Sequence, residues 1–196
     1  LISASVDSLQ SMLRICESEA VAIGMEFNAK KSNIIRVGPR CKNSICDIML
    51  NGDRVQVVSS AKYLGVTLVC AKRFKLSFEE PRKKFFRAVN GILSKCIGRM
   101  SEMSLLHIIH AKCKPLIMYA LEAVTLLKSE LSEIQAMLNV IYYKIFDVRD
   151  VGNITVINDM VNIRSCVDEY DKRRSRYLMC LRRSGHSITH FMAEFF

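Results

Sequence analysis

The feature that most constrains the fold is a change in hydrophobic pattern near Val69. Before this residue, apolar and β-branched residues gather in short segments that are typical of strands. After it, apolar residues recur every three or four positions over long stretches, which is the period of an amphipathic helix. The strand-like segments are residues 33–37, 45–50, 54–58 and 63–69. The chain is therefore predicted to be an α+β protein in which a small antiparallel sheet precedes a helical bundle.

The strand-like part begins with one predicted helix. From residue 7 to residue 23 the apolar side chains are spaced by three and four, and Gly24 follows as a stop signal. Between the second and third strand segments lies Asn51-Gly52, a dipeptide that favours the positive φ angles of a two-residue type I′ turn. We expect the helix to pack beside the sheet that this hairpin forms.

The second part of the chain predicts a series of helices. Residues 78–99 place apolar side chains on one face and basic side chains on the other at 100° per residue. Residues 104–127 continue the helical pattern, which Pro115 should break because proline removes a donor and clashes with the preceding turn. Further helices are predicted at 130–146 and 166–184, joined by a linker at 147–153. The chain is therefore predicted to contain three segments, residues 1–70, 71–150 and 151–196, of which the last is a basic helical extension.

The net charge of the chain favours one class of binding partner. Its 29 Lys and Arg against 19 Asp and Glu give a net charge of +10, which favours a polyanion such as nucleic acid. The most apolar stretch, residues 104–127, is interrupted by charged residues, so no membrane-spanning segment is predicted. No secretory signal is visible, and the eight cysteines contain no Cys-x-x-Cys pair. We therefore expect an intracellular protein with free thiols.

Two short motifs flank the predicted hairpin. Gly24 leads into Asn28-Ala29-Lys30-Lys31-Ser32, and Tyr63-Leu64-Gly65 follows the hairpin. In this order they resemble motif D and motif E, the primer grip, at the end of the palm in reverse transcriptases of non-LTR (LINE-type) retrotransposons. The resemblance implies that Lys31, with Lys30 as substitute, is the general acid for the departing pyrophosphate in a complete enzyme. It also implies that Tyr63, Leu64 and Gly65 contact the primer backbone, which a glycine allows to approach closely.

A third motif lies in the helical part. The segment Lys114-Pro115-Leu116-Ile117-Met118-Tyr119-Ala120-Leu121-Glu122 is similar to the thumb of the same family, where a tyrosine-glycine pair precedes a glutamate. Ala120 occupies the place of the usual glycine, and the tryptophan often found shortly afterwards is absent. The resemblance implies that residues 1–70 are the last part of a palm and residues 71–150 a thumb.

The same resemblance indicates what the chain lacks. Nucleotidyl transfer in this family needs two Mg²⁺ ions, held by an aspartate of an early strand and by an Ala-Asp-Asp turn. No Asp-Asp pair occurs in the sequence, and Leu1-Ile2-Ser3 resembles the residues that follow that turn. We expect the chain to be the later part of an RNA-directed DNA polymerase whose fingers and first palm half lie upstream. Alone, it should bind no Mg²⁺ and extend no primer.

A basic strip completes the candidate nucleic-acid contacts. Such a strip can follow phosphates without reading sequence, and in a thumb it would hold an RNA–DNA hybrid. Its members are Lys72, Arg73, Lys75, Lys83, Lys84, Arg87, Lys95 and Arg99. Two alternatives stay open, namely a non-catalytic basic helical module for a protein partner and a decayed retroelement remnant.

Two sets of potential metal ligands are weaker candidates. His107, His110 and Cys113 recur every three residues on a predicted helix but lack a fourth ligand. A looser Cys-x13-Cys-x5-His-x3-His array contains no close cysteine pair and has one cysteine within a predicted helix. Its members are Cys166, Cys180, His186 and His190. Satisfied or solvated histidines are favoured, no metal site is predicted, and zinc binding by the array is left open.

Overall fold

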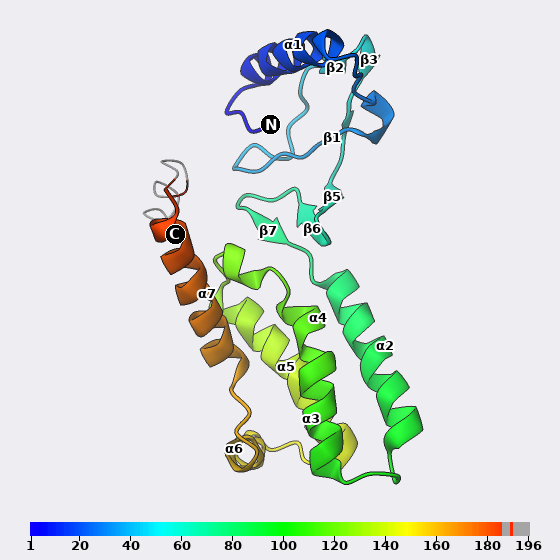
Figure 1. The fold of residues 1–196 in the computed structure, drawn as a ribbon, viewed down its shortest axis with the longest axis vertical. Coiled ribbons are helices and arrows are strands. Elements are labelled where there is room, and N and C mark those ends of the chain that lie inside the picture. The colour runs from blue at the N-terminus through cyan, green and yellow to red at the C-terminus, as the bar shows by residue number, and fades with distance from the viewer. Residues whose placement is uncertain (186–188, 190–196) are drawn as a thin grey trace. The chain divides into compact units, whose positions relative to one another are not determined.

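The change from short strands to long helices is present in the computed structural model, which describes residues 1–185 and 189. The chain forms two compact units, Leu1–Ser77 and Phe78–Phe196. The strands of the described residues lie in the first unit, and the second is helical (Figure 1). The α+β class is therefore confirmed in general terms.

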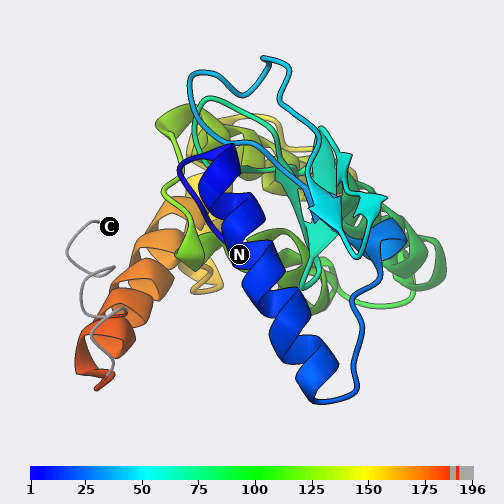
Figure 2. The same ribbon diagram turned by 90° about the horizontal axis from the view of Figure 1, so that it is seen from above.

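Helix α1, Val6–Ala22, matches the predicted N-terminal helix and is unbroken in both ribbon views (Figures 1 and 2). Ser5 caps its start, because the Ser5 hydroxyl accepts a hydrogen bond from the Ser8 N–H at 3.2 Å. The helix ends as predicted before Gly24, whose φ of +71° suits glycine.

The predicted single antiparallel sheet is wrong, because the strands form three small sheets. Strands β2 (Met49–Leu50) and β3 (Asp53–Arg54) form the predicted hairpin, and Asn51 and Gly52 have the positive φ angles, 52° and 81°, of its turn. The other strands are β1 (Asn33–Ile34), β4 (Gln56–Val57), β5 (Ser60–Tyr63), β6 (Val66–Val69) and β7 (Lys75–Leu76). β1 and β4 pair in parallel, whereas β5, β6 and β7 form an antiparallel sheet.

Helix α1 is attached to the hairpin by a glutamine side chain. Gln10 accepts a hydrogen bond from the Met49 N–H at 2.8 Å and donates one to the Met49 carbonyl at 2.9 Å. It therefore occupies the place of a neighbouring strand on the free edge of β2. Beneath it, a small core consists of Ala29, Leu50 and Val55, with Leu13 and Ile34 packed against them.

The second unit contains the predicted helices and one more. Pro115 breaks the helical pattern as predicted, since α3 ends at Lys112 and α4 begins at Lys114. The predicted linker at 147–153 is too long, because α6 begins at Val151 behind an Asp150 cap. The helices are α2 (Glu79–Cys96), α3 (Glu102–Lys112), α4 (Lys114–Met118), α5 (Lys128–Phe146), α6 (Val151–Met160) and α7 (Cys166–Arg183), with the 3-10 turn η2 (Leu121–Ala123) between α4 and α5.

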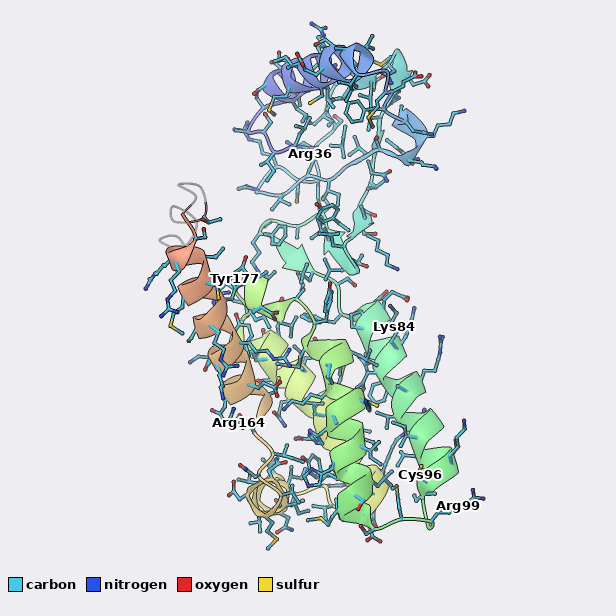
Figure 3. All side chains as sticks on the ribbon, in the orientation of Figure 1. Arg36, Lys84, Cys96, Arg99, Arg164 and Tyr177 are labelled. Atoms are coloured by element: carbon cyan, nitrogen blue, oxygen red, sulfur yellow. The ribbon has the colours of Figure 1, made fainter. Side chains whose placement is uncertain are left out.

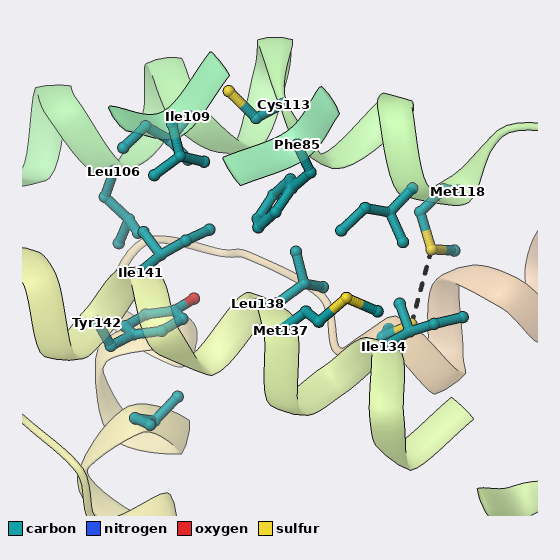
Figure 4. Close-up of a cluster of buried hydrophobic side chains, with 14 of the residues drawn as sticks. Phe85, Leu106, Ile109, Cys113, Met118, Ile134, Met137, Leu138, Ile141 and Tyr142 are labelled. Carbon is teal, nitrogen blue, oxygen red and sulfur yellow. Dashed lines mark hydrogen bonds between the residues drawn. The ribbon is translucent and has the colours of Figure 1, made fainter. Parts of the chain in front are cut away.

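One hydrophobic core joins all of these helices. In Figure 4 the side chains of α5 point toward those of α2 and α3, and the fully buried Phe85 of α2 belongs to this cluster. Ile154 of α6 and Cys166 and Tyr170 of α7 are buried in the same cluster. The Tyr170 hydroxyl also donates to the Val124 carbonyl at 2.8 Å. The predicted basic extension, residues 151–196, thus contributes helices to the same compact unit as α2–α5.

Ala120 occupies a backbone position that would suit glycine. Its φ of 60° lies in the left-handed region, which costs an L-residue roughly 1–2 kcal/mol. Ala120→Gly should therefore stabilise the protein by about 0.5–1 kcal/mol, after the larger backbone entropy of glycine in the unfolded chain is subtracted. Urea unfolding measures this change. Ala136→Gly, on the exposed face of α5, is the matched control and should destabilise by about 1 kcal/mol; equal losses in both variants would contradict the prediction.

Candidate nucleic-acid interface

The turn that carries Lys31 is closed by the residues flanking it. The Asn28 side chain accepts a hydrogen bond from the Lys31 N–H at 3.2 Å, and the Ser32 hydroxyl donates to the Asn28 carbonyl at 2.9 Å. Between them the 3-10 turn η1, Ala29–Lys31, buries Ala29 and leaves both lysine side chains exposed. The Asn-x-x-Lys-Ser spacing thus lets Asn28 and Ser32 close a turn whose Lys31 side chain points outward.

Tyr63-Leu64-Gly65 does not form the start of a strand, as the sequence predicted, but the tip of a hairpin. β5 ends at Tyr63, β6 begins at Val66, and Tyr63 pairs with Val66 across the turn. Leu64 and Gly65 both have positive φ, 46° and 85°, as a two-residue type I′ turn requires. The Tyr63 and Leu64 side chains are 63% and 75% exposed, so two large apolar groups stand at the tip.

The predicted basic strip is divided between the two units. Lys72 and Arg73 lie in the loop before β7, and Lys75 belongs to β7 itself, so these three are part of the first unit. All three are exposed. The other five members belong to α2 or follow it closely in the second unit. The structure therefore describes two basic surfaces, each fixed on its own unit.

The surface on α2 has the predicted two-faced form. Phe85, Val89 and Leu93 are buried, whereas the basic residues point outward. Its exposed members are Lys83, Lys84, Arg87 and Lys95, with Arg99 three residues beyond the helix end (Figure 3). The two acids of α2, Glu79 and Glu80, lie in its first turn, and Glu80 pairs with Lys83 at 3.3 Å. Among the described residues, Lys84, Arg87, Lys95 and Arg99 form no ion pair.

A basic pocket of about 450 Å³ in the second unit was not predicted from the sequence. At its base, the Lys114 ammonium contacts the Glu169 carboxylate at 2.5 Å and donates to the Arg164 carbonyl at 3.0 Å. Arg173 contacts the other Glu169 oxygen at 2.7 Å. Burial acts to raise the pKa of Glu169, but the hydrogen bonds and charges of Lys114 and Arg173 outweigh it and hold this pKa below its ordinary value.

His110 lines the same pocket. The Tyr142 hydroxyl donates its proton to the Asn158 side-chain oxygen, so the 3.1 Å contact with His110 Nε2 is one in which the ring N–H donates to the Tyr142 oxygen. Burial, and then the charge of Lys114, lower the pKa of His110 to about 4, which keeps the ring neutral. Burial likewise raises the pKa of Tyr142 to about 12.

The two sets of potential metal ligands do not form a metal site in the part of the chain that is described. Within residues 1–185 and 189, no group of three or more His, Cys, Asp or Glu side chains could hold a metal ion. Cys166 and Cys180 lie fourteen residues apart on α7, which separates them by about 21 Å along the helix axis. One ion cannot bind both cysteines, so the array that the sequence left open does not form a single zinc site that includes the two of them. His186 and His190 lie outside the described residues.

Comparisons with known proteins add no family assignment. No protein-family model, curated protein or solved structure matches the chain. In the described part of the chain, no helix has both the length and the apolar character needed to cross a membrane. Sequence reasoning did not identify the residues of the basic pocket, above all Lys114 and Arg164. The signal that could have indicated them is the Lys-Pro pair at the helix break together with the basic run on α7.

Proposed function

We propose that the chain binds nucleic acid, in the manner of the last palm segment and thumb of a non-LTR reverse transcriptase, and that it does not polymerise by itself. The outer face of α2 carries the proposal. Along it, Lys84, Arg87 and Lys95 form no ion pair with a described residue, and a duplex phosphate backbone supplies the missing negative charge. The bound polymer is an RNA–DNA hybrid in the family that the motifs resemble.

The dimensions of this face suit a phosphate backbone. Lys84 and Lys95 lie eleven residues apart on the helix, which is about 16 Å along its axis. Between them, Gly91 adds no side chain, and nothing lies within 4 Å of the position that a Cβ would occupy. A backbone can therefore approach α2 closely at Gly91 while the longer cations reach phosphates on either side.

The first unit supplies two further features that fit the proposal. The Lys31 turn holds a cation outward, as motif D requires, and the Tyr63-Leu64-Gly65 tip exposes a tyrosine ring and a leucine next to a glycine. Aromatic rings and glycine backbone are common contacts of nucleotide sugars and bases. Within the described residues no group of three or more His, Cys, Asp or Glu side chains could hold a metal ion, and no catalytic step is proposed for this chain.

Charge reversal on α2 is the test. Lys83→Glu with Lys84→Glu should weaken binding of an RNA–DNA hybrid by at least about tenfold at low salt, because two attractive charges become repulsive. The dependence of log K on log salt concentration should also become shallower by about two, since two fewer counterions are released. Fluorescence anisotropy with a labelled hybrid over a series of salt concentrations measures both quantities.

A control with the same net charge separates this surface from the overall field of the protein. Lys112→Glu with Lys128→Glu changes two exposed lysines on α3 and α5, outside the α2 face. This variant should retain most of the affinity and the original salt slope. Absence of hybrid binding at low salt, or equal weakening by both double variants, would show that the α2 face is not a nucleic-acid surface.

A further inference from the structure

The pocket between α3, α4 and α7 differs from the α2 face in being concave and strongly cationic. Five cationic side chains and one carboxylate line it, together with His110 and with apolar atoms of Pro115 and Ile163. The charged members are Lys114, Arg164, Lys172, Arg173, Arg176 and Glu169. Arg164 comes from the segment between α6 and α7 (Figure 3), so three separate parts of the chain converge here.

The carboxylate neutralises only the base of the pocket. Glu169 is shared by Lys114 and Arg173, which leaves both of its oxygens occupied. Arg164, Lys172 and Arg176 have no ion pair with any described residue. Like charges held around one cavity repel each other, and a bound anion removes that repulsion. Two guanidinium groups also offer paired N–H donors, which match the oxygens of a tetrahedral anion.

His110 lines the pocket as an uncharged ring. Its Nε2 lies 3.1 Å from the Tyr142 hydroxyl, and its Nδ1 is closed off from solvent without a hydrogen-bond partner among the described residues. Because solvent in the open pocket does not reach Nδ1, a ligand bound there would contact the cations and not this nitrogen. The anion-binding character of the pocket therefore comes from the cations alone.

We propose that this pocket is a binding site for a phosphate monoester or diphosphate group, held by Arg164, Lys172 and Arg176 above the Lys114–Glu169 pair. The chemistry fits because such a group carries up to two negative charges per phosphorus centre near neutral pH, with several acceptor oxygens for the cationic donors. The group can come from a free nucleotide or pyrophosphate, or from the phosphorylated 5′ end of an oligonucleotide. The site is independent of the α2 face.

Pyrophosphate is the probe for the first test. Added to the full chain, it should produce saturable shifts in the NMR signals of the His110 ring and of the Arg164 and Arg176 side chains, and leave Arg87 on α2 unchanged. Replacing the three unpaired cations, by Arg164→Gln, Lys172→Gln and Arg176→Gln, should weaken binding at least about tenfold, since charge-assisted hydrogen bonds are lost. Circular dichroism verifies that the variant retains its helices.

The matched control removes three exposed cations elsewhere, by Lys128→Gln, Arg182→Gln and Arg183→Gln, and should bind pyrophosphate within about twofold of the original chain. The proposal is overturned by unsaturable shifts, or by equal weakening in the two triple variants. Competition then identifies the source. A 5′-phosphorylated oligonucleotide that displaces pyrophosphate better than its 5′-hydroxyl counterpart indicates a nucleic-acid end. Equal displacement by the two oligonucleotides, with stronger displacement by a nucleoside diphosphate, indicates a free nucleotide.

Discussion

Replacing Glu169 by glutamine should destabilise the second unit by about 3–5 kcal/mol, because it removes the counter-ion of a buried lysine. The Lys114 side chain is only 7% exposed, and Glu169 is the one carboxylate that it contacts among the described residues. Glutamine keeps the volume and one acceptor but not the charge. Lys114 would then retain only uncharged acceptors, the Arg164 carbonyl and the glutamine amide oxygen. Urea unfolding at neutral pH, followed by the loss of helical circular dichroism, measures the change.

Two controls separate this effect from a general loss of surface charge. Glu133 contacts Arg82 at 3.9 Å, and more than half of each side chain is exposed, so Glu133→Gln should cost less than about 1 kcal/mol. Adding Lys114→Met to Glu169→Gln removes the buried charge itself and should recover part of the lost stability. If Glu169→Gln cost no more than Glu133→Gln, the pair would contribute nothing to holding α4 on α7.

The elements that the sequence predicted correctly are those whose signals are local. Asn51-Gly52 specifies its turn through the positive φ angles of two adjacent residues, and Pro115 interrupts a helix by its own covalent structure. The outward basic face of α2 follows from spacing alone. In each case the energy that decides the structure arises within one or two turns of chain, so neighbouring residues suffice to predict it.

The elements that were missed depend on partners distant in sequence. Residues 151–160 contain a glycine and several β-branched residues, which are weak helix formers, and burial of Ile154 in the core compensates in α6. Strand β1 has two residues, too few for alternation to indicate a parallel partner. Leu64 occupies a left-handed position that leucine seldom adopts, so no turn dipeptide was apparent.

The two candidate surfaces also differ in whether local sequence predicts them. The α2 face lies within one helix and was predicted residue by residue, although its function is still a proposal. The pocket needs Lys114 and Glu169 to meet across fifty-five residues, and no periodicity predicts that meeting. Sequence reasoning therefore finds surfaces that a single helix presents, and it overlooks concave sites that the packing of several helices creates.

The histidine in that pocket makes the stability of the protein sensitive to mild acid. Burial comes first among the causes that lower the pKa of His110 from 6.5 to about 4, and the charges of Lys114 and His107 act in the same direction. Glu169 opposes them. The fold thus favours the neutral ring, whereas the unfolded chain takes up a proton once the pH falls below 6.5.

Stability should therefore be fully present above pH 6.5 and fall by about 3 kcal/mol as the pH decreases toward 4, because the unfolded state binds the additional proton. The Glu169 ion pair contributes only at the acidic end of this window, because its stabilisation is present above the ordinary carboxyl pKa of 4.5 and is lost as the pH falls below it. His110→Gln should flatten the decline in unfolding free energy, measured with urea at several pH values. His107→Gln, on the exposed side of the same helix, should keep it steep. An unchanged slope in His110→Gln would assign the acid sensitivity to another group.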